Sequence, residues 1–256
     1  GERQFQGFAG DRGQGFADQA LAPVSLPQEA RWVLVGTIPL ATAASASTLK
    51  AALEQARQQQ FLIALDVNWR PTFWDPAADP AAGPDSAVLA AIQPVLQQAA
   101  LIKVSREEAL WFFNTDDPAA IRAALSQQPD VVITDGSAPV RWCLEAQTGI
   151  QPDFNPPEVV DTTGAGDAFT AGLLHRWAAA PAERIRFAVA CGALVRPPVA
   201  RGVIARQLGW LDVERDAIPS HGLLEGQHGA VERKHRQARC RRERPQHDRL
   251  LHSVLH

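Results

Sequence analysis

The most informative segment of this 256-residue chain reads Asp161-Thr162-Thr163-Gly164-Ala165-Gly166-Asp167-Ala168-Phe169. It follows the β-branched pair Val159-Val160 and leads into an apolar stretch. That order predicts an extended segment, then a glycine turn, then the start of a helix. A Gly-Ala-Gly turn leaves its N–H groups unshielded, and a helix N-terminus adds unpaired donors and the positive end of the helix dipole. The segment is therefore predicted to bind an anion at Gly164, Ala165 and Gly166.

Asp167 is the unusual member of this segment, because a carboxylate inside an anion site repels the anion unless it has a chemical task. We interpret Asp167 as a base that takes a proton from an alcohol while the alcohol attacks a phosphoryl group held at the turn. The alternative is an ordinary glycine-rich turn before a helix, in which the dipole alone favours an aspartate.

Residues 31–195 alternate between strand-like and helix-like segments, after an irregular or edge-strand region at 1–23. Apolar runs predict strands at 31–36, 61–66, 100–104 and 130–134, with a hairpin starting at 140–144; helices are predicted near 45–60, 86–98, 106–113, 118–127, 166–179 and 182–194. Such alternation predicts an α/β fold with a doubly wound, mostly parallel sheet and helices on both faces. Ligands of these sheets bind at the carboxyl ends of the strands.

Polar segments follow three of the predicted strands: Asp66-Val67-Asn68-Trp69-Arg70-Pro71, Lys103-Val104-Ser105-Arg106-Glu107-Glu108 and Thr134-Asp135-Gly136. In the first, Asp66, Asn68 and Arg70 would point into one crevice. Alternatively, the Asn and Asp cap the loop and Arg70 pairs with a carboxylate. Ser105 and Glu108 form a capping-box pattern, which explains both residues without a ligand. The Asp-Gly of the third segment is also a common turn.

The run from 161 to 172 closely resembles the C-terminal signature of the ribokinase-like (pfkB-type) sugar kinases, and the segment 66–74 is similar to that of fructokinases. The resemblance covers residues 1–195 and implies a ribokinase-like fold. It implies ATP-dependent phosphorylation of a sugar hydroxyl, with fructose preferred over 2-keto-3-deoxygluconate or a nucleoside. ATP and Mg²⁺ are the implied cofactors, with K⁺ in some members. The oligomeric state is left open, with a homodimer as one option. The alternative is a catalytically impaired nucleotide-binding remnant.

The resemblance also implies roles for individual residues. Asp167 matches the general base, and Gly164, Ala165 and Gly166 match the anion hole. The sugar-binding positions are Asn68 and Arg70. The nucleotide-binding positions are Lys103, Ser105 (where Asn is usual), Thr134, Gly136 and Cys191. The metal-linked positions are Glu108, indirectly for Mg²⁺, and Asp161 and Thr163 for a monovalent cation in some members.

Composition indicates the compartment. Three scattered cysteines, Cys143, Cys191 and Cys240, fit neither a disulfide framework nor a metal motif, and no apolar run approaches a membrane span. A cytoplasmic protein is therefore expected. The chain contains no methionine, and it lacks the strand, sugar-binding Asp and Gly-Gly motif with which family members begin. We therefore expect a fragment or a processed product, with much of the sugar pocket missing.

Residues 196–256 differ in composition from the rest. They hold 12 of the 25 Lys and Arg residues but 7 of the 28 Asp and Glu residues, and 6 of the 7 histidines. We predict a partial kinase domain at 1–195 and an irregular basic tail at 196–256, with a reading-frame change near Val195 as the favoured hypothesis. A nucleic-acid-binding tail is the less favoured alternative, since the segment lacks interleaved aromatic residues.

Overall fold

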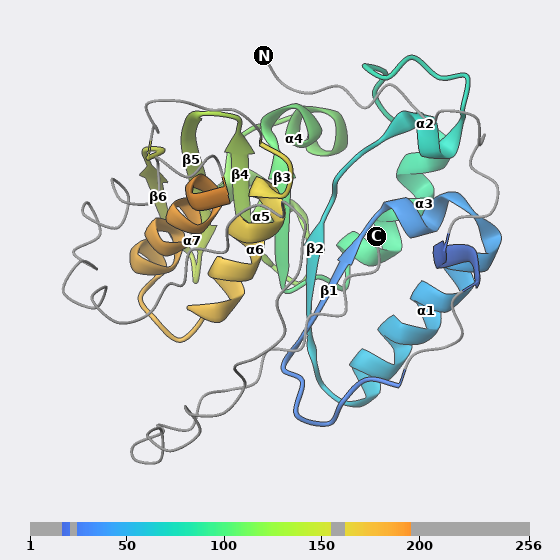
Figure 1. The fold of residues 1–256 in the computed structure, drawn as a ribbon, viewed down its shortest axis with the longest axis horizontal. Helices are drawn as coiled ribbons and strands as arrows, with labels where there is room; N and C mark the ends of the chain where they lie inside the picture. The colour runs from blue at the N-terminus through green and yellow to red at the C-terminus, as the bar shows by residue number, and fades with distance from the viewer. Residues whose placement is uncertain (1–16, 21–24, 155–161, 196–256) are drawn as a thin grey trace, which may run out of the picture.

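The computed structural model describes residues 17–20, 25–154 and 162–195, and these form a six-stranded sheet with its helices (Figure 1). The strands are β1 (Trp32–Gly36), β2 (Leu62–Asp66), β3 (Leu101–Ser105), β4 (Asp130–Asp135), β5 (Ala138–Leu144) and β6 (Gln147–Gln151). They lie in sequence order across the sheet. β1 to β4 are parallel, whereas β5 and β6 are antiparallel to their neighbours. The predicted α/β class with a mostly parallel sheet is confirmed.

The helices also follow the predicted order. They are α1 (Ala43–Gln58), α2 (Pro71–Trp74), α3 (Ser86–Leu96), α4 (Arg106–Phe113), α5 (Pro118–Ala124), α6 (Ala165–His175) and α7 (Pro181–Val195), with 3₁₀ segments η1 (Ala17–Ala20) and η2 (Ile38–Ala41). The sequence did not predict α2, a single turn that Pro71 begins because a missing N–H is harmless there. In the described ranges, no helix is both long and apolar enough to cross a membrane.

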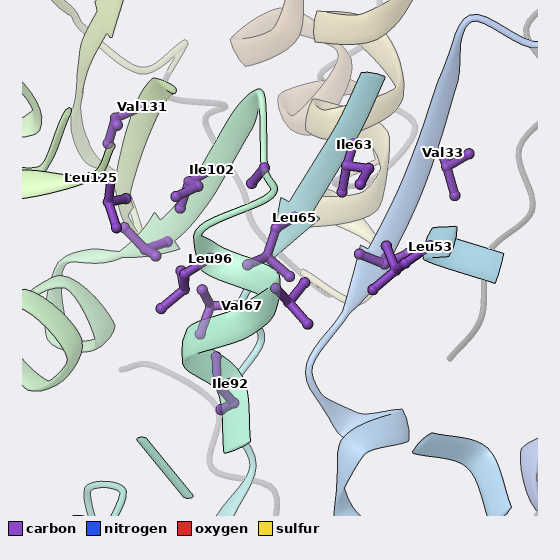
Figure 2. Packing of buried hydrophobic residues seen from close by; sticks show 14 of the residues in the cluster. Val33, Leu53, Ile63, Leu65, Val67, Ile92, Leu96, Ile102, Leu125 and Val131 are labelled. Carbon is purple, nitrogen blue, oxygen red and sulfur yellow. The ribbon is translucent and has the colours of Figure 1, made fainter. Parts of the chain in front are cut away.

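One face of the sheet packs against α1, α3 and α5. Sequential parallel strands joined by right-handed crossovers place their connecting helices on the same face. The resulting core contains the strand residues Val33, Ile63, Leu65, Ile102 and Val131 and the helix residues Leu53, Ile92 and Leu96 (Figure 2). Because these strands are covered on both faces, they are apolar without alternation, as the sequence indicated.

The other face packs against α6 and α7. Its core joins Leu101 and Val132 of the sheet to Phe169, Leu173 and Ile185 of the two helices. Helices on both faces were predicted, and the two core clusters confirm them.

Two glycines allow α6 and α7 to approach closely (Figure 1). A Cβ on Gly172 would lie 2.8 Å from the Cys191 Sγ, and a Cβ on Gly192 would lie 3.0 Å from the Ala165 carbonyl oxygen. The second contact places α7 directly against the first residue of α6. Packing between these helices therefore fixes the position of the glycine-rich turn.

The β5–β6 hairpin forms the antiparallel edge of the sheet. Its two-residue turn, Glu145-Ala146, has φ angles of 51° and 61°, as in the turns whose twist matches paired strands. Trp142 lies opposite Gly149, where a Cβ would overlap its ring. The glycine thus makes room for the indole across the hairpin.

Candidate active site

The glycine-rich turn forms the start of α6, as predicted. Gly164 is the N-cap residue and has φ of 77°, a left-handed conformation that glycine adopts without strain. The Ala168 N–H donates to the Gly164 carbonyl at 2.9 Å, which closes the first helical bond. Gly166 and Asp167 follow in the exposed first turn. The Ala165 N–H donates to the Thr162 carbonyl oxygen at 3.1 Å. Helix geometry directs the next N–H groups, those of Gly166 and Asp167, toward the N-terminal end of the helix, where the dipole is positive.

Two metal-linked predictions lie at this turn. Thr163 is exposed immediately before Gly164. Asp161 lies outside the described residues. The proposed monovalent-cation role of both therefore stays a prediction.

A buried lysine approaches the turn from the sheet. Lys103, the third residue of β3, is 8% exposed, and its Nζ donates to Asp66 Oδ2 at 2.7 Å. A Cβ built on Gly166 would lie 3.5 Å from the same Nζ. Figure 1 shows the start of α6 beside the end of β3. The fold thus brings together residues 66, 103 and 166, which the sequence places in three separate motifs.

Glu108 joins two strand ends through its carboxylate. Oε1 accepts the Trp69 N–H at 2.6 Å and Oε2 accepts the Ser105 N–H at 2.7 Å. The Ser105 Oγ accepts the Glu108 N–H at 3.1 Å, so the predicted capping box is present. Burial raises the pKa of Glu108, the charge of Asp66 adds to this, and the two backbone donors oppose it. Each carboxylate oxygen thus accepts one backbone hydrogen bond, and the indirect role of Glu108 in Mg²⁺ binding stays a prediction.

The loop after β2 carries the two predicted sugar-binding residues. Asn68 has φ of 45°, and the Arg70 Nη1 donates to the Trp69 carbonyl at 2.7 Å. The Trp69 Nε1 donates to the Ala82 carbonyl at 2.8 Å. The Trp69 ring also packs edge-on against the Phe112 ring, with 6.3 Å between the ring centroids. The loop is therefore held in place by Trp69 and by Glu108. In the described residues, the hydrogen bond of the Arg70 guanidinium is to this carbonyl rather than to a carboxylate.

The remaining nucleotide-side predictions lie on neighbouring elements. Ser105 and Thr134 pair across β3 and β4, so their strand ends are adjacent. Gly136 has φ of 54° in the turn that follows. Cys191 lies farther along α7, where its thiol contacts the Gly172 position and burial raises the thiol pKa. Helix packing accounts for Cys191, and its nucleotide-binding role stays a prediction.

The donor set suits phosphate better than a bare metal ion. In the part of the chain that the structure describes, no three His, Cys, Asp or Glu side chains converge as metal ligands. Asp66 is paired with Lys103, and Glu108 accepts two backbone donors. The turn and the nearby ammonium fit the phosphates of ATP, and Mg²⁺ in such sites is commonly bound largely through those phosphates.

A separate hollow of about 230 Å³ lies at the β4–β5 edge and is lined by Arg106, Ile133, Asp135, Ala138, Pro139, Arg141 and Ile150. Ile133 belongs to the core under α1, α3 and α5, so this hollow is on the opposite face from α6. Arg106 and Arg141 both pair with Asp116 at 2.8 Å. The hollow is therefore distinct from the phosphate-side site.

Comparison with known proteins agrees with this geometry. Residues 1–197 match the family described as pfkB family carbohydrate kinase, and the chain belongs to that family. It is 36% identical over 191 residues to the fructokinase of Klebsiella pneumoniae, covering 70% of this chain and 59% of that protein. It is 34% identical to a fructokinase of Salmonella thompson, covering 70% and 82% respectively. The predicted family is confirmed.

Solved fructokinase structures are similar in fold to this chain. Fructokinase of Vibrio cholerae with fructose, ADP and calcium ion bound is 26% identical, with a TM-score of 0.57 over 73% of this chain and 63% of that one. A double mutant of that enzyme with fructose, ADP and potassium ion bound is 25% identical, with a TM-score of 0.58 over 73% and 62%. The chain thus spans about three fifths of the length of these relatives.

Sequence reasoning placed Asp66 in a polar crevice but gave it no partner. The available signal was positional, because Asp66 ends one predicted strand and Lys103 lies near the end of the next. In the structure the two residues are direct neighbours in the parallel register. The bond from the Trp69 N–H to Glu108 joins residues 39 apart and had no signal in the sequence.

Proposed function

We propose that this chain transfers the terminal phosphoryl group of ATP to a sugar hydroxyl, with Asp167 as general base. The supporting observation is the composition of the first turn of α6. Gly164 begins the turn in a left-handed conformation, and Asp167 is exposed in the first turn of α6. The buried Lys103 ammonium lies beside Gly166. Anion donors and a carboxylate within one helical turn are what this reaction requires.

In the proposed reaction, one bond to the terminal phosphorus forms as another breaks. The sugar oxygen forms a bond to the terminal phosphorus as the bond from that phosphorus to the β-phosphate oxygen breaks. The hydroxyl proton passes to the Asp167 carboxylate, and ADP leaves. The N–H groups at the Gly164–Gly166 turn stabilise the charge on the transferring phosphoryl group. When bound to the phosphates, Mg²⁺ would neutralise part of their charge.

Fructose is the acceptor that we favour. The supporting observations are the names of the relatives, which are fructokinases at 34–36% identity, and the segment that carries Asn68 and Arg70. A planar guanidinium beside a left-handed Asn offers donors suited to sugar hydroxyls. 2-Keto-3-deoxygluconate and a nucleoside remain the other acceptors to test.

A second candidate is nucleotide binding without transfer. It is supported by the extent of the match, since the chain spans 59% of the Klebsiella pneumoniae fructokinase. The described elements supply the phosphate-side turn and the loop after β2. If the sugar also needs contacts that this chain does not supply, ATP would bind and no phosphoryl group would be transferred.

The test compares the unmodified chain with Asp167→Asn in an assay that couples ADP formation to a colour change, with each of the three acceptors. Loss of the base is expected to lower turnover roughly 10²- to 10⁴-fold and to leave ATP binding intact. Glu183→Gln is the matched control, because Glu183 is an exposed carboxylate in the first turn of the neighbouring helix α7.

Undiminished turnover in Asp167→Asn would contradict the assigned base. ATP binding by calorimetry without turnover for any acceptor would favour the second candidate. Turnover with a nucleoside but not with fructose would overturn the preferred acceptor and leave the kinase reaction standing.

A further inference from the structure

The connection between α2 and α3 carries a short sequence repeat that the proposed mechanism does not use (Figure 1). Residues 75–82 read Asp-Pro-Ala-Ala twice in succession. We propose that this connection, residues 75–85, acts through Trp69 to position Asn68 and Arg70 for the acceptor sugar. The inference rests on the proposed function and deepens it, because it names a positioning residue and a supporting segment for acceptor binding.

The two Asp-Pro-Ala-Ala units form the same closed turn. Asp79 Oδ1 accepts the Ala81 N–H at 2.9 Å, and the Asp79 carbonyl oxygen accepts the Ala82 N–H at 2.8 Å. Asp75 makes the same two bonds within the first unit, at 2.8 and 2.9 Å. The proline that follows each Asp has its φ fixed at a value suited to the second position of such a turn. Two of these turns in succession make the connection a stiff support.

The second turn ends on the indole of Trp69. The Ala82 carbonyl, which follows directly from that turn, accepts the Trp69 Nε1–H at 2.8 Å. The connection also lies against α4, because a Cβ on Gly83 would be 3.0 Å from the Trp111 ring. Trp69 is only 5% exposed, and an indole has a single N–H donor. The position of the Ala82 carbonyl therefore sets the orientation of the Trp69 ring.

Trp69 in turn lies between the two predicted sugar-binding residues. Asn68 has φ of 45°, a left-handed conformation that a residue other than glycine keeps when its surroundings hold it there. The Trp69 carbonyl accepts the Arg70 Nη1–H at 2.7 Å, and the Trp69 N–H donates to Glu108. All three polar groups of Trp69 are thus bonded. A shift of its indole would move the backbone that carries Asn68 and Arg70.

The neighbouring Trp74 shows that an indole can be buried here without such a bond. Its ring packs against Trp69 with 5.9 Å between the ring centroids. Its Nε1 is buried and, among the described residues, has no hydrogen-bond partner. The two tryptophans therefore share an environment, and only Trp69 is tied by its N–H to the 75–85 connection. They form a matched pair for a test.

Steady-state kinetics in the coupled ADP assay test the role of Trp69, with ATP and the acceptor varied in turn. The acceptor is fructose, or whichever of the three acceptors the unmodified chain uses. Trp69→Phe keeps an aromatic ring and removes the N–H. It is expected to raise the KM for the acceptor roughly 3- to 10-fold, the net effect of one hydrogen bond. The kcat and the KM for ATP should be essentially unchanged, because the α6 turn is not touched.

Trp74→Phe is the control, since it removes an indole N–H that has no partner among the described residues. It should leave both KM values and kcat unchanged. A role of Trp69 in stability alone would lower the melting temperature of Trp69→Phe without separating the two KM values, and that result would contradict the inference.

Asp79→Ala tests the supporting segment. It removes the Oδ1 bond of the second turn and leaves the exposed surface otherwise unaltered. The KM for the acceptor is expected to rise by a smaller factor than in Trp69→Phe. Because the connection acts through the Trp69 indole, Asp79→Ala should cause no further rise in the Trp69→Phe background. Additive rises in the double variant would overturn the role of the connection.

The outcomes separate this inference from the function on which it rests. If the unmodified chain turns over none of the acceptors, the proposed function fails, and the inference fails with it. If turnover is present and Trp69→Phe has an unchanged KM for the acceptor, or an equal rise in the KM for ATP, the inference alone is overturned. Thermal unfolding checks that each variant is folded. If Trp69→Phe does not fold, Asp79→Ala decides, and an unchanged KM for the acceptor in that variant overturns the inference.

Discussion

Asp116 shows how one side chain can link two distant parts of the chain. Its carboxylate accepts hydrogen bonds from the Arg106 Nε at 2.8 Å and lies 2.8 Å from the Arg141 Nη1. Arg106 at the start of α4 and Arg141 on β5 are thereby held together. The hydrogen bond from Arg106, followed by that from Arg141, lowers the pKa of Asp116 below its ordinary 3.8.

The sign of the pH dependence follows from that lowered pKa. A carboxyl group whose pKa is lower in the folded state stabilises the fold above its unfolded-state pKa, and the contribution disappears as pH falls through the folded-state value. We expect Asp116→Asn to lower the free energy of unfolding at pH 7. The difference from the unmodified chain should shrink once the pH falls below about 3.8, the ordinary value.

Urea unfolding followed by circular dichroism at several pH values measures this difference. Glu107→Gln, at an exposed carboxylate in the same helical turn as Arg106, is the control. A difference between Asp116→Asn and the unmodified chain that stays constant down to pH 2 would mean that the ion pairs do not cause it.

Individual residues also show which contacts the sequence could predict and which it could not. Ser105 and Glu108 were identified as a capping box, because the two residues are three apart and interact locally. The same Glu108 also accepts the Trp69 N–H, which no local pattern indicates. That hydrogen bond depends on the adjacency of β2 and β3, so it followed only from the assembled sheet.

At the scale of elements, the contact between α6 and α7 controls the phosphate-side turn. Gly192 of α7 lies against the Ala165 carbonyl, where a Cβ would be at 3.0 Å. Because that neighbour is backbone, relief requires the start of α6 to move. We expect Gly192→Ala to lower the free energy of unfolding by about 1–3 kcal/mol through overpacking, partly offset by better helix propensity. We also expect it to weaken ATP binding by displacing the turn.

Gly172→Ala is the matched control for this prediction. It adds a methyl group to the same helix pair, where a Cβ would be 2.8 Å from the Cys191 Sγ, but away from the turn. Thermal unfolding and ATP titration should show both variants destabilised and only Gly192→Ala impaired in binding. Equal losses of binding in the two variants would show that general loosening, rather than displacement of the turn, is responsible.

At the scale of the whole molecule, the described core lies in the sheet, its helices and the loops next to them. The two main clusters of buried residues lie between Leu26 and Val189. The composition of residues 196–256, rich in Arg and His, predicts a segment that contributes little apolar burial. We expect a chain ending at residue 195 to unfold cooperatively, with a free energy of unfolding within about 1 kcal/mol of the full chain.

Parallel urea titrations of the two chains measure that difference. Loss of the cooperative transition in the shorter chain would show that the tail completes the domain, against the predicted boundary at 195. A salt-sensitive affinity for DNA in the full chain alone would instead favour the nucleic-acid alternative.

The sequence by itself determined the class of the fold and most of its strands and longer helices, though not the single turn of α2. Strand and helix periodicity, the capping box and the Gly164–Gly166 turn all depend on residues near one another in the chain, so their physics is local. Only the tertiary structure decided which strand ends meet. The pair Asp66 and Lys103, the bond from Trp69 to Glu108 and the contact of Gly192 with Ala165 each join residues at least 27 apart. Their proximity depends on strand order and on how closely α6 and α7 pack. The turn from 161 to 169 therefore predicted an anion site, and the packed sheet supplied the buried ammonium beside it.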